Sequence, residues 1–175
     1  MVSLRVVTLD DVPGLTDLLS DSRSYLQPFE PRRNDSYFQR DYQAQIIRAK
    51  LLAYESGRSV PFLIVDGEKI LGQLALSGIE MGALKSAFIG YWVARDYTDR
   101  EVATSAVRRA REYAFGELGL HRLQAATTVE NIPSQRVLAK VGFERIGYAP
   151  HYMEINGMWR DHLLFQLINQ EITPG

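Results

Sequence analysis

The chain has 175 residues, of which 46% are hydrophobic and 23% charged, and its formal net charge at pH 7 is −1. This length suits one domain with a continuous core, and the near-zero charge gives no sign of a surface built for nucleic acid or membrane. Cysteine is absent, which excludes disulfides, thiolate metal ligands and a cysteine nucleophile.

The sequence shows no pattern typical of a secretory leader or a membrane span. The N-terminus lacks a charged leader followed by a long apolar run, and no apolar window approaches the length of a membrane span. We therefore expect a cytoplasmic protein with a single domain over residues 1–170 and a short tail at 171–175.

The first third of the chain predicts a strand and two helices. Leu4–Leu9 is rich in β-branched residues, and Asp10–Pro13 combines cap-forming acids with a proline suited to a first helical turn. This helix is expected to end at the serine-rich residues 20–24. An ordered loop with two prolines follows at 25–35, and a second helix is expected over 36–55, where apolar residues recur at helical spacing.

The middle of the chain predicts three strands that lead into a helix. Residues 61–65 and 70–76 flank Asp66-Gly67, a pair typical of a hairpin turn, and residues 85–93 give a third strand. A polar turn then leads into a helix beginning near Val102. The unpaired N–H groups at such a helix start are a common phosphate site.

The last third predicts a strand over 120–128, a short helix over 135–141 introduced by Asn131, and two strands over 143–155 and 160–168. The expected order is β-α-α-β-β-β-α-β-α-β-β, with no internal repeat. This alternation is typical of one mixed α/β domain.

Several groups of residues recur here in a recognisable order. They are Ile89-Gly90-Tyr91-Trp92-Val93 with Val102-Ala103-Thr104; Asn131-x-x-Ser134-x-Arg136-Val137-Leu138-x-Lys140-x-Gly142-Phe143; Asn156-Gly157-x-Trp159-Arg160-Asp161-His162; and, nearer the N-terminus, Tyr25-Leu26-x-Pro28-Phe29 and Gly72. With these residues at these spacings the chain resembles the GNAT superfamily of acyl-coenzyme A dependent N-acyltransferases. More narrowly it is similar to the RimJ/RimL branch, whose known members acetylate the N-terminal amine of ribosomal proteins.

The resemblance implies an α/β fold with a mixed sheet of about seven strands, splayed in the middle and flanked by about four helices. It implies transfer of an acyl group, acetyl above all, from acyl-CoA to a primary amine by direct attack, without a metal. The acceptor would be a small molecule or a protein N-terminus, and the protein a monomer or homodimer.

The resemblance also implies roles for individual residues. Ser134 would be the general acid for the leaving thiolate, and the Val93 N–H would polarise the thioester carbonyl. Coenzyme A would be held by Trp92, Val93, Arg95, Arg100, Val102, Ala103, Thr104, Asn131 and Arg136. The acceptor would meet Tyr25, Leu26, Phe29 and Tyr91. Purely structural alternatives are core packing for the aromatic residues and helix capping for Asn131.

The general base is not evident, because the strand over 85–93 has no carboxylate. His151 and Glu154 could flank the acceptor amine, or could simply be exposed strand residues. For His121 and His162 we expect structural pairing rather than catalysis. Glu30 and Asp35 could attract a cationic amine, or could simply be solvated.

One departure from the family concerns the pyrophosphate loop, which normally reads Gln/Arg-x-x-Gly-x-Gly/Ala. The aligned residues are Thr98–Ala103, of which only Ala103 fits, while Asp99 and Glu101 stand where glycines are usual. Three explanations compete: the acids point to solvent and coenzyme A still binds; another carrier such as aminoacyl-tRNA or acyl-carrier protein brings the acyl group; or the protein is a non-catalytic binding module.

Overall fold

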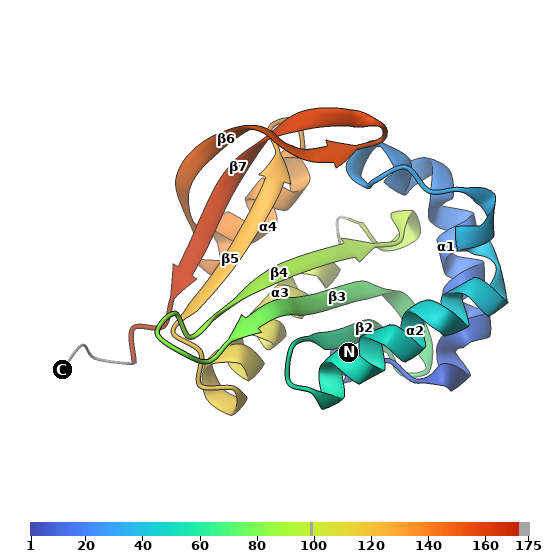
Figure 1. The fold of residues 1–175 in the computed structure, drawn as a ribbon, viewed down its shortest axis with the longest axis horizontal. Coiled ribbons are helices and arrows are strands. Elements are labelled where there is room, and N and C mark those ends of the chain that lie inside the picture. The colour runs from blue at the N-terminus through green and yellow to red at the C-terminus, as the bar shows by residue number, and fades with distance from the viewer. Residues whose placement is uncertain (99, 172–175) are drawn as a thin grey trace.

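The computed structural model describes residues 1–98 and 100–171, and Asp99 and residues 172–175 lie outside this description. Seven strands form one sheet in the order β1-β2-β3-β4-β5-β7-β6 (Figure 1). All neighbouring strands are antiparallel except β4 and β5, which are parallel. The strands are β1 (Val2–Val6), β2 (Val60–Asp66), β3 (Lys69–Glu80), β4 (Ser86–Val93), β5 (Arg122–Thr128), β6 (Glu144–Ile155) and β7 (Met158–Ile168).

Four α-helices flank the sheet: α1 (Val12–Leu26), α2 (Arg40–Glu55), α3 (Val102–Glu112) and α4 (Ile132–Val141). Consecutive side chains of β2 are buried from Val60 to Val65. Since successive side chains of a strand point to opposite sides of the sheet, both faces of β2 are covered. Leu63 and Val65 pack with α1 and α2, whereas Phe62 and Ile64 belong to the core that contains α3 and α4. The sheet is therefore covered on both faces, and the element order expected from the sequence is confirmed.

The first helix is longer than the sequence indicated. It continues through the serines to Leu26, where the expected end was 20–24. The Ser20 hydroxyl donates to the Thr16 carbonyl at 2.9 Å, while Ser22 and Leu26 are buried. Serine therefore continues the helix here because its hydroxyl bonds within the helix and its small side chain fits the packed face.

The second helix is shorter than expected. Asp35–Phe38 forms a separate 3₁₀ turn, and α2 begins only at Arg40. The Asn34 side chain accepts a hydrogen bond from the Tyr37 N–H, and Gln39 is extended. A cap at Asn34 thus satisfies the short turn on its own, and the chain changes direction before α2 starts.

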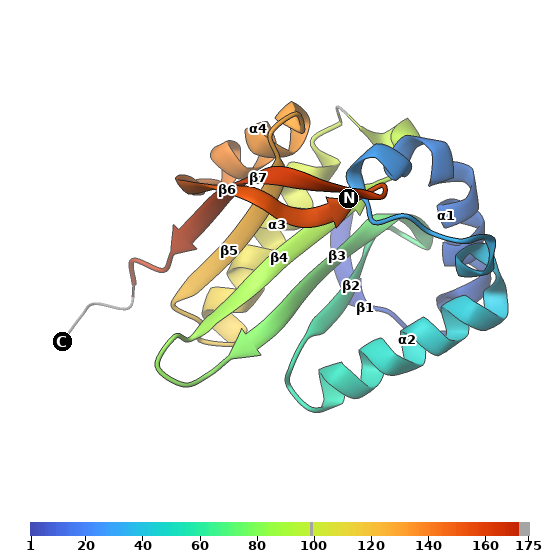
Figure 2. The same ribbon diagram turned by 45° about the horizontal axis from the view of Figure 1, so that its top comes forward.

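Strands β4 and β5 pair only at their beginnings. Ser86, Ala87 and Phe88 lie opposite Arg122, Leu123 and Gln124, and beyond this point the two strands separate. From Ile89 onward, the edge of β4 that faces β5 has no strand partner. Figure 2 shows the hairpin of β6 and β7 crossing above this opening towards the end of α1. Among the described helices none combines the length and the apolar character needed to cross a bilayer.

Candidate active site

A cleft of about 180 Å³ lies where β4 and β5 separate. Its walls come from β4, β5, the start of α4, the end of α1 with the turn after it, and the hairpin of β6 and β7. Six of the residues assigned to the site from sequence line it: Leu26, Phe29, Tyr91, Trp92, Asn131 and Ser134. The structure therefore brings together segments that are more than a hundred residues apart in the chain.

The end of β4 leaves main-chain groups unpaired beside this cleft, although Val93 itself does not line it. The Ala94 N–H donates to the Leu71 carbonyl of β3 at 2.8 Å. Because successive N–H groups along a strand point to opposite edges, the N–H of Val93 points away from β3 to the open edge. This is the orientation that the predicted role of Val93 as a carbonyl-polarising donor requires.

Gly72 determines how closely β3 approaches β4 at this point. It lies opposite Val93, and a Cβ added to Gly72 would fall 2.1 Å from the Trp92 carbonyl oxygen and 2.9 Å from the Val93 Cα. Both neighbours are main-chain atoms, which cannot rotate away as a side chain would. Glycine is therefore required for the position of the Trp92–Val93 segment.

Two hydroxyl groups meet across the cleft. The Tyr91 and Ser134 hydroxyl oxygens are 2.9 Å apart, and Asn131 accepts a hydrogen bond from the Ser134 N–H at 3.2 Å. Asn131 therefore caps α4, the structural role considered from the sequence, and at the same time positions Ser134. Burial raises the pKa of Tyr91 to about 12, although its hydrogen bond with Ser134 acts in the opposite direction. The Tyr91 hydroxyl consequently stays protonated at neutral pH.

The loop before α3 accommodates its unusual glutamate. Glu101 adopts the left-handed conformation at φ 59°, which a glycine would take readily. Its carboxylate forms an ion pair with the Lys140 ammonium on α4, and this hydrogen bond lowers the pKa of Glu101. Among the described residues, no side chain caps the start of α3. Asp99, the second acid of this loop, lies outside the described residues.

Five of the remaining predicted coenzyme contacts lie around the start of α3. Val102 and Thr104 are buried, whereas Arg95 and Arg100 are exposed just before the helix. Ala103 is partly buried, and Arg136 lies exposed on α4. None of the six lines the cleft. Tyr25 is also outside it, because its ring packs towards Phe29 with centroids 6.4 Å apart.

The structure does not bring the two predicted bases into the cleft. His151 is exposed at φ 47° in an irregular part of β6, where its N–H donates to the Asp161 carboxylate at 2.8 Å. Glu154 is exposed between Met153 and Ile155, which do line the cleft, so alternation along the strand turns Glu154 away. Their assignment as bases thus loses its geometric support.

Four polar residues of the cleft were not assigned to catalysis from sequence. His162 is 3% exposed and lines the cleft, as do Glu30, Thr127 and Thr128. Within residues 1–98 and 100–171, Thr127 Oγ1 is the one fully buried side-chain polar atom without a hydrogen-bond partner. Alternation on β5 and β7 could have indicated a shared face, but the position of the cleft depends on where two strands separate, which local patterns do not reveal.

The end of the cleft beside α1 is closed by a contact between distant loops. The Asn156 N–H, at the tip of the β6–β7 hairpin, donates to the Glu30 carbonyl at 2.8 Å, and the Gln27 amide donates to the Asn156 side chain at 3.3 Å. Burial raises the pKa of the Glu30 carboxyl, against the opposing effects of Arg33 and Lys50. This end therefore holds a partly desolvated acid.

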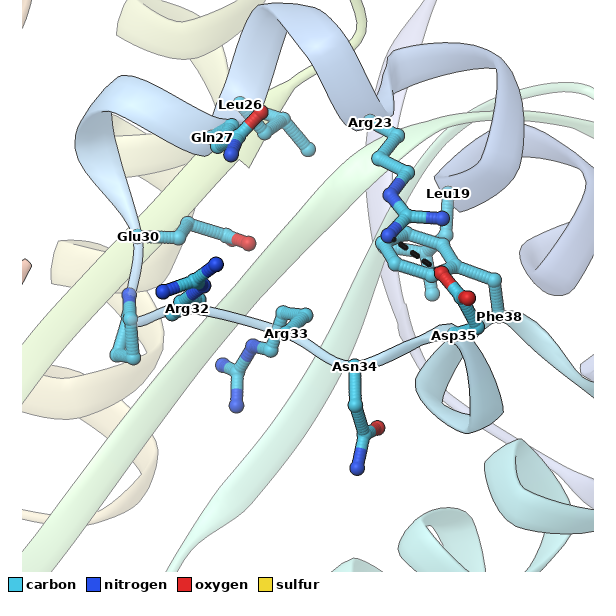
Figure 3. A pocket seen from close by; sticks show the side chains of 11 residues that line it. Leu19, Arg23, Leu26, Gln27, Glu30, Arg32, Arg33, Asn34, Asp35 and Phe38 are labelled. Carbon is cyan, nitrogen blue, oxygen red and sulfur yellow. Dashed lines mark hydrogen bonds and ion pairs between the residues drawn. The ribbon is translucent and has the colours of Figure 1, made fainter. Parts of the chain in front are cut away.

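A larger cavity of about 410 Å³ adjoins this end and shares Leu26 and Glu30 with the cleft. Figure 3 shows Glu30 and Arg32 at one end of it and the ion pair of Arg23 with Asp35, 2.7 Å long, at the other. It lies beside the open edge of β4 rather than along it. The smaller cleft, where the main-chain donors and the hydroxyl pair meet, is therefore the candidate reaction site, and the larger cavity is an annex to it.

The described residues were also compared with the ligand groups that hold metal ions. No group of three His, Cys, Asp or Glu side chains that could hold a metal ion occurs in the part of the chain that the structure describes. The polar groups of the cleft are instead hydroxyls, main-chain amides, one histidine and one carboxylate.

Comparison with known proteins agrees with this architecture. Residues 2–144 match the family described as the acetyltransferase (GNAT) domain. The probable N-acetyltransferase YjcK of Bacillus subtilis (strain 168) is 32% identical over 172 residues, which cover 97% of this chain and 95% of that protein. The [ribosomal protein uS5]-alanine N-acetyltransferase of Escherichia coli (strain K12) is 29% identical over 175 residues, covering 98% and 90%.

A solved structure extends the similarity to the whole fold. Mycobacterium smegmatis RimJ in complex with CoA-disulfide is 33% identical and superimposes with a TM-score of 0.94, covering 99% of this chain and 85% of that one. The chain therefore belongs to the GNAT acetyltransferase family, in its RimJ/RimL-like branch, and is an N-acetyltransferase.

Proposed function

We propose that this enzyme transfers an acetyl group from acetyl-CoA to the α-amino group of a protein N-terminus, with a ribosomal protein as the first candidate. The observation that carries the proposal is the unpaired edge of β4, where the N–H of Val93 points away from β3, together with the hydroxyl pair of Tyr91 and Ser134 in the adjoining cleft. A thioester held on that edge would have its carbonyl beside a main-chain donor and its sulfur beside a hydroxyl.

The donor end of the cleft suits a pantetheine arm and a pyrophosphate. The unpaired edge of β4 offers main-chain hydrogen bonds to an extended amide-bearing chain. The start of α3 supplies the free N–H groups that bind phosphate well. The relative RimJ of M. smegmatis was solved with a coenzyme A disulfide, which supports the same carrier here.

The acidic loop is compatible with such a donor. The ion pair with Lys140 offsets the negative charge of Glu101, and the left-handed conformation of Glu101 leaves the main chain of the loop where a glycine would put it. This removes the objection that Glu101 raised to pyrophosphate at this loop and favours coenzyme A over a different carrier; the second acid, Asp99, lies outside the described residues.

The hydroxyl pair would deliver a proton to the leaving sulfur, and both hydroxyl groups would be protonated again at the end of the reaction. Full transfer from a group of pKa about 12 to a thiolate whose conjugate acid has a pKa of about 8.5 would cost roughly 5 kcal/mol. Tyr91 therefore supports Ser134 through a hydrogen bond, and Ser134 passes on a proton that it regains from the reacting amine. The N–H of Val93 stabilises the negative charge that develops on the carbonyl oxygen.

The acceptor end suits the start of a polypeptide better than a free small amine. The amine would enter below the contact between Glu30 and Asn156, and the adjoining cavity gives room for the residues that follow the first one. The similar E. coli enzyme acts on the alanine of a ribosomal protein. Such an acceptor would place the reaction in the cytoplasm.

The proposal is tested by acetyl transfer from acetyl-CoA to a peptide with a free N-terminal alanine, followed by thiol release and by mass spectrometry that locates the acetyl group. We expect acetylation of the α-amine, no reaction with the same peptide already acetylated, and a much lower kcat/KM for a small polyamine. Saturating acetyl-CoA should raise the midpoint of thermal unfolding by several degrees.

Two results would contradict the proposal. Efficient transfer to the polyamine but not to the peptide would assign a small-molecule acceptor. No stabilisation by acetyl-CoA, together with stabilisation by the 3′-terminal fragment of an aminoacyl-tRNA, would assign a different donor.

A further inference from the structure

We propose that His162 is the general base of this enzyme and that its Nε2 atom takes a proton from the acceptor amine. The inference rests on the proposed transfer to an amine and goes beyond it by assigning the base, which neither His151 nor Glu154 is placed to supply. The argument depends on where His162 lies, which ring nitrogen is protonated, and which other groups could compete.

His162 lies on β7 in the part of the sheet beyond the β4–β5 opening. It is opposite Thr128 of β5 and Ala149 of β6, it is 3% exposed, and its ring lines the cleft. Its neighbour Leu163 belongs to the core on the α3 and α4 side. Alternation along β7 therefore places His162 on the other face. That face carries the acceptor end, since the β6–β7 hairpin tip contacts the loop after α1.

The tautomer of His162 follows from one hydrogen bond. Its Nδ1 atom is 2.9 Å from the Arg160 carbonyl oxygen. A carbonyl oxygen only accepts hydrogen bonds, so Nδ1 must carry the proton. In the neutral ring this leaves the lone pair on Nε2, where a base needs it.

The Nε2 atom remains available to a ligand. It has no hydrogen-bond partner among the described residues. It is also not fully buried, because only one described side-chain polar atom is both fully buried and unpaired, and that atom is Thr127 Oγ1. The ring packs against Tyr152 at 5.3 Å between centroids, so its orientation is fixed. An oriented, unpaired nitrogen that borders the cleft is the geometry expected of a general base.

The charged and titratable groups near His162 are already engaged. Asp161, the preceding residue, bonds to the Tyr148 hydroxyl and the His151 N–H, and Arg160 pairs with Glu130 at 3.2 Å. These contacts hold the charges on β6 and β7 away from the imidazole.

Two titratable groups from other elements share the cleft with His162. Burial raises the pKa of Tyr91 to about 12, so at neutral pH Tyr91 is a protonated phenol and cannot serve as the base. Burial raises the pKa of Glu30, whereas Arg33 and Lys50 both favour its ionised form, and in that form its negative charge suits attraction of an ammonium group. Glu30 therefore recruits the cationic amine, and His162 removes its proton.

The proton balance of the reaction is then complete. The ammonium group gives one proton to Nε2, and the neutral nitrogen attacks the thioester carbonyl carbon to form the C–N bond. The C–S bond breaks as the carbonyl re-forms, and the second amine proton reaches the sulfur through the Ser134 hydroxyl. The imidazolium returns its proton to water, so the products are an amide, a thiol and one proton.

The decisive variant is His162→Asn, since the asparagine amide can replace the Nδ1–H donor to Arg160 but provides no base. With the N-terminal alanine peptide, we expect kcat/KM at neutral pH to fall on the order of 100-fold while coenzyme A affinity stays unchanged. The remaining rate should follow the fraction of unprotonated peptide amine, which has a pKa of about 8. His121→Asn is the matched control and should behave like the wild type, because its main chain and not its ring makes the recorded bonds at the start of β5.

The proposal would be overturned by a His162→Asn enzyme that keeps the wild-type kcat and the same loss of rate at acid pH. If that variant does not fold, His162→Gln and the addition of imidazole to His162→Ala test the same point, because a positioning role would not be rescued by free imidazole.

Nitrogen NMR of the wild type gives a test that needs no acceptor. A proton on Nε2 and a bare Nδ1 would contradict the assignment. Failure of the wild type to acetylate any amine would instead count against the proposed function.

Discussion

The proposed donor and acceptor sides of the site are built in different ways. The donor side consists mainly of main chain: the unpaired edge of β4, the close contact at Gly72, and the start of α3, which lies outside the cleft. The acceptor end consists of side chains from four separate segments, among them Glu30 after α1 and His162 on β7.

This difference explains which part of the site tolerates change. A main-chain site keeps its function through substitutions that preserve backbone geometry, as Glu101 does by adopting a left-handed conformation and pairing with Lys140. A side-chain site changes its specificity with each substitution. We therefore expect donor recognition to be shared with relatives and acceptor recognition to be individual, and the following variants test that contrast.

Gly72→Ala should have the largest effect and should damage the donor end. The new Cβ overlaps main-chain atoms of Trp92 and Val93, so β4 must move. We expect a loss of about 1–3 kcal/mol in unfolding free energy and about 100-fold in kcat/KM, since a displacement near 1 Å can cost that much. Gly14→Ala is the control, because its Cβ would make ordinary contact at 3.5 Å. Near-normal activity of Gly72→Ala would show that the Trp92–Val93 position is not critical.

Ser134→Ala and Tyr91→Phe act where the two ends meet. We expect kcat to fall about 100-fold for Ser134→Ala and about 10-fold for Tyr91→Phe, because the first removes the proton relay and the second only its supporting hydrogen bond. The double variant should be no worse than Ser134→Ala alone. Absorbance titration of the wild type should include a tyrosine that ionises near pH 12 and that is missing from Tyr91→Phe. Equal effects of the two single variants would contradict this division of roles.

Glu30→Gln should affect only the acceptor end. We expect KM for the peptide to rise about 10-fold while the coenzyme A affinity is unchanged, because a half-buried negative charge that attracts the amine is lost. Burial raises the pKa of Glu30 in the folded state, so its ionised form opposes folding. The variant should therefore be more stable than the wild type at neutral pH, and the difference should disappear below the pKa of an unfolded glutamate, where both states are protonated. A variant less stable at pH 7 would show that Arg33 and Lys50 outweigh burial.

Lys140→Ala should have the smallest effect and should sharpen the account of the acidic loop. Freeing Glu101 should weaken coenzyme A binding about threefold, as expected for an exposed ion pair. Adding Glu101→Gly should restore the affinity, and Glu101→Gly alone should change it little, which calorimetric titration of coenzyme A can measure. If Glu101→Gly alone tightens binding strongly, the carboxylate repels phosphate despite Lys140.

The sequence alone determined the order of the elements and pointed to one stretch as the place for a donor. Alternating and helical spacings gave all seven strands and four helices, and the residues from Ile89 to Thr104 indicated a strand that leads into a phosphate-binding helix start. These features are local, since a strand, a turn and a helix cap depend on residues within a few positions of one another.

Only the tertiary structure decided how α1 ends, what neutralises Glu101 and which residues face the amine. His151 and His162 look alike as strand residues, but the irregular pairing of β6 turns one outward while β7 carries the other into the cleft. Lys140 and Glu101 are 39 residues apart and meet because α3 and α4 pack side by side. Such contacts depend on strand order and on the point where β4 leaves β5, and these are properties of the whole sheet that no short stretch of sequence encodes.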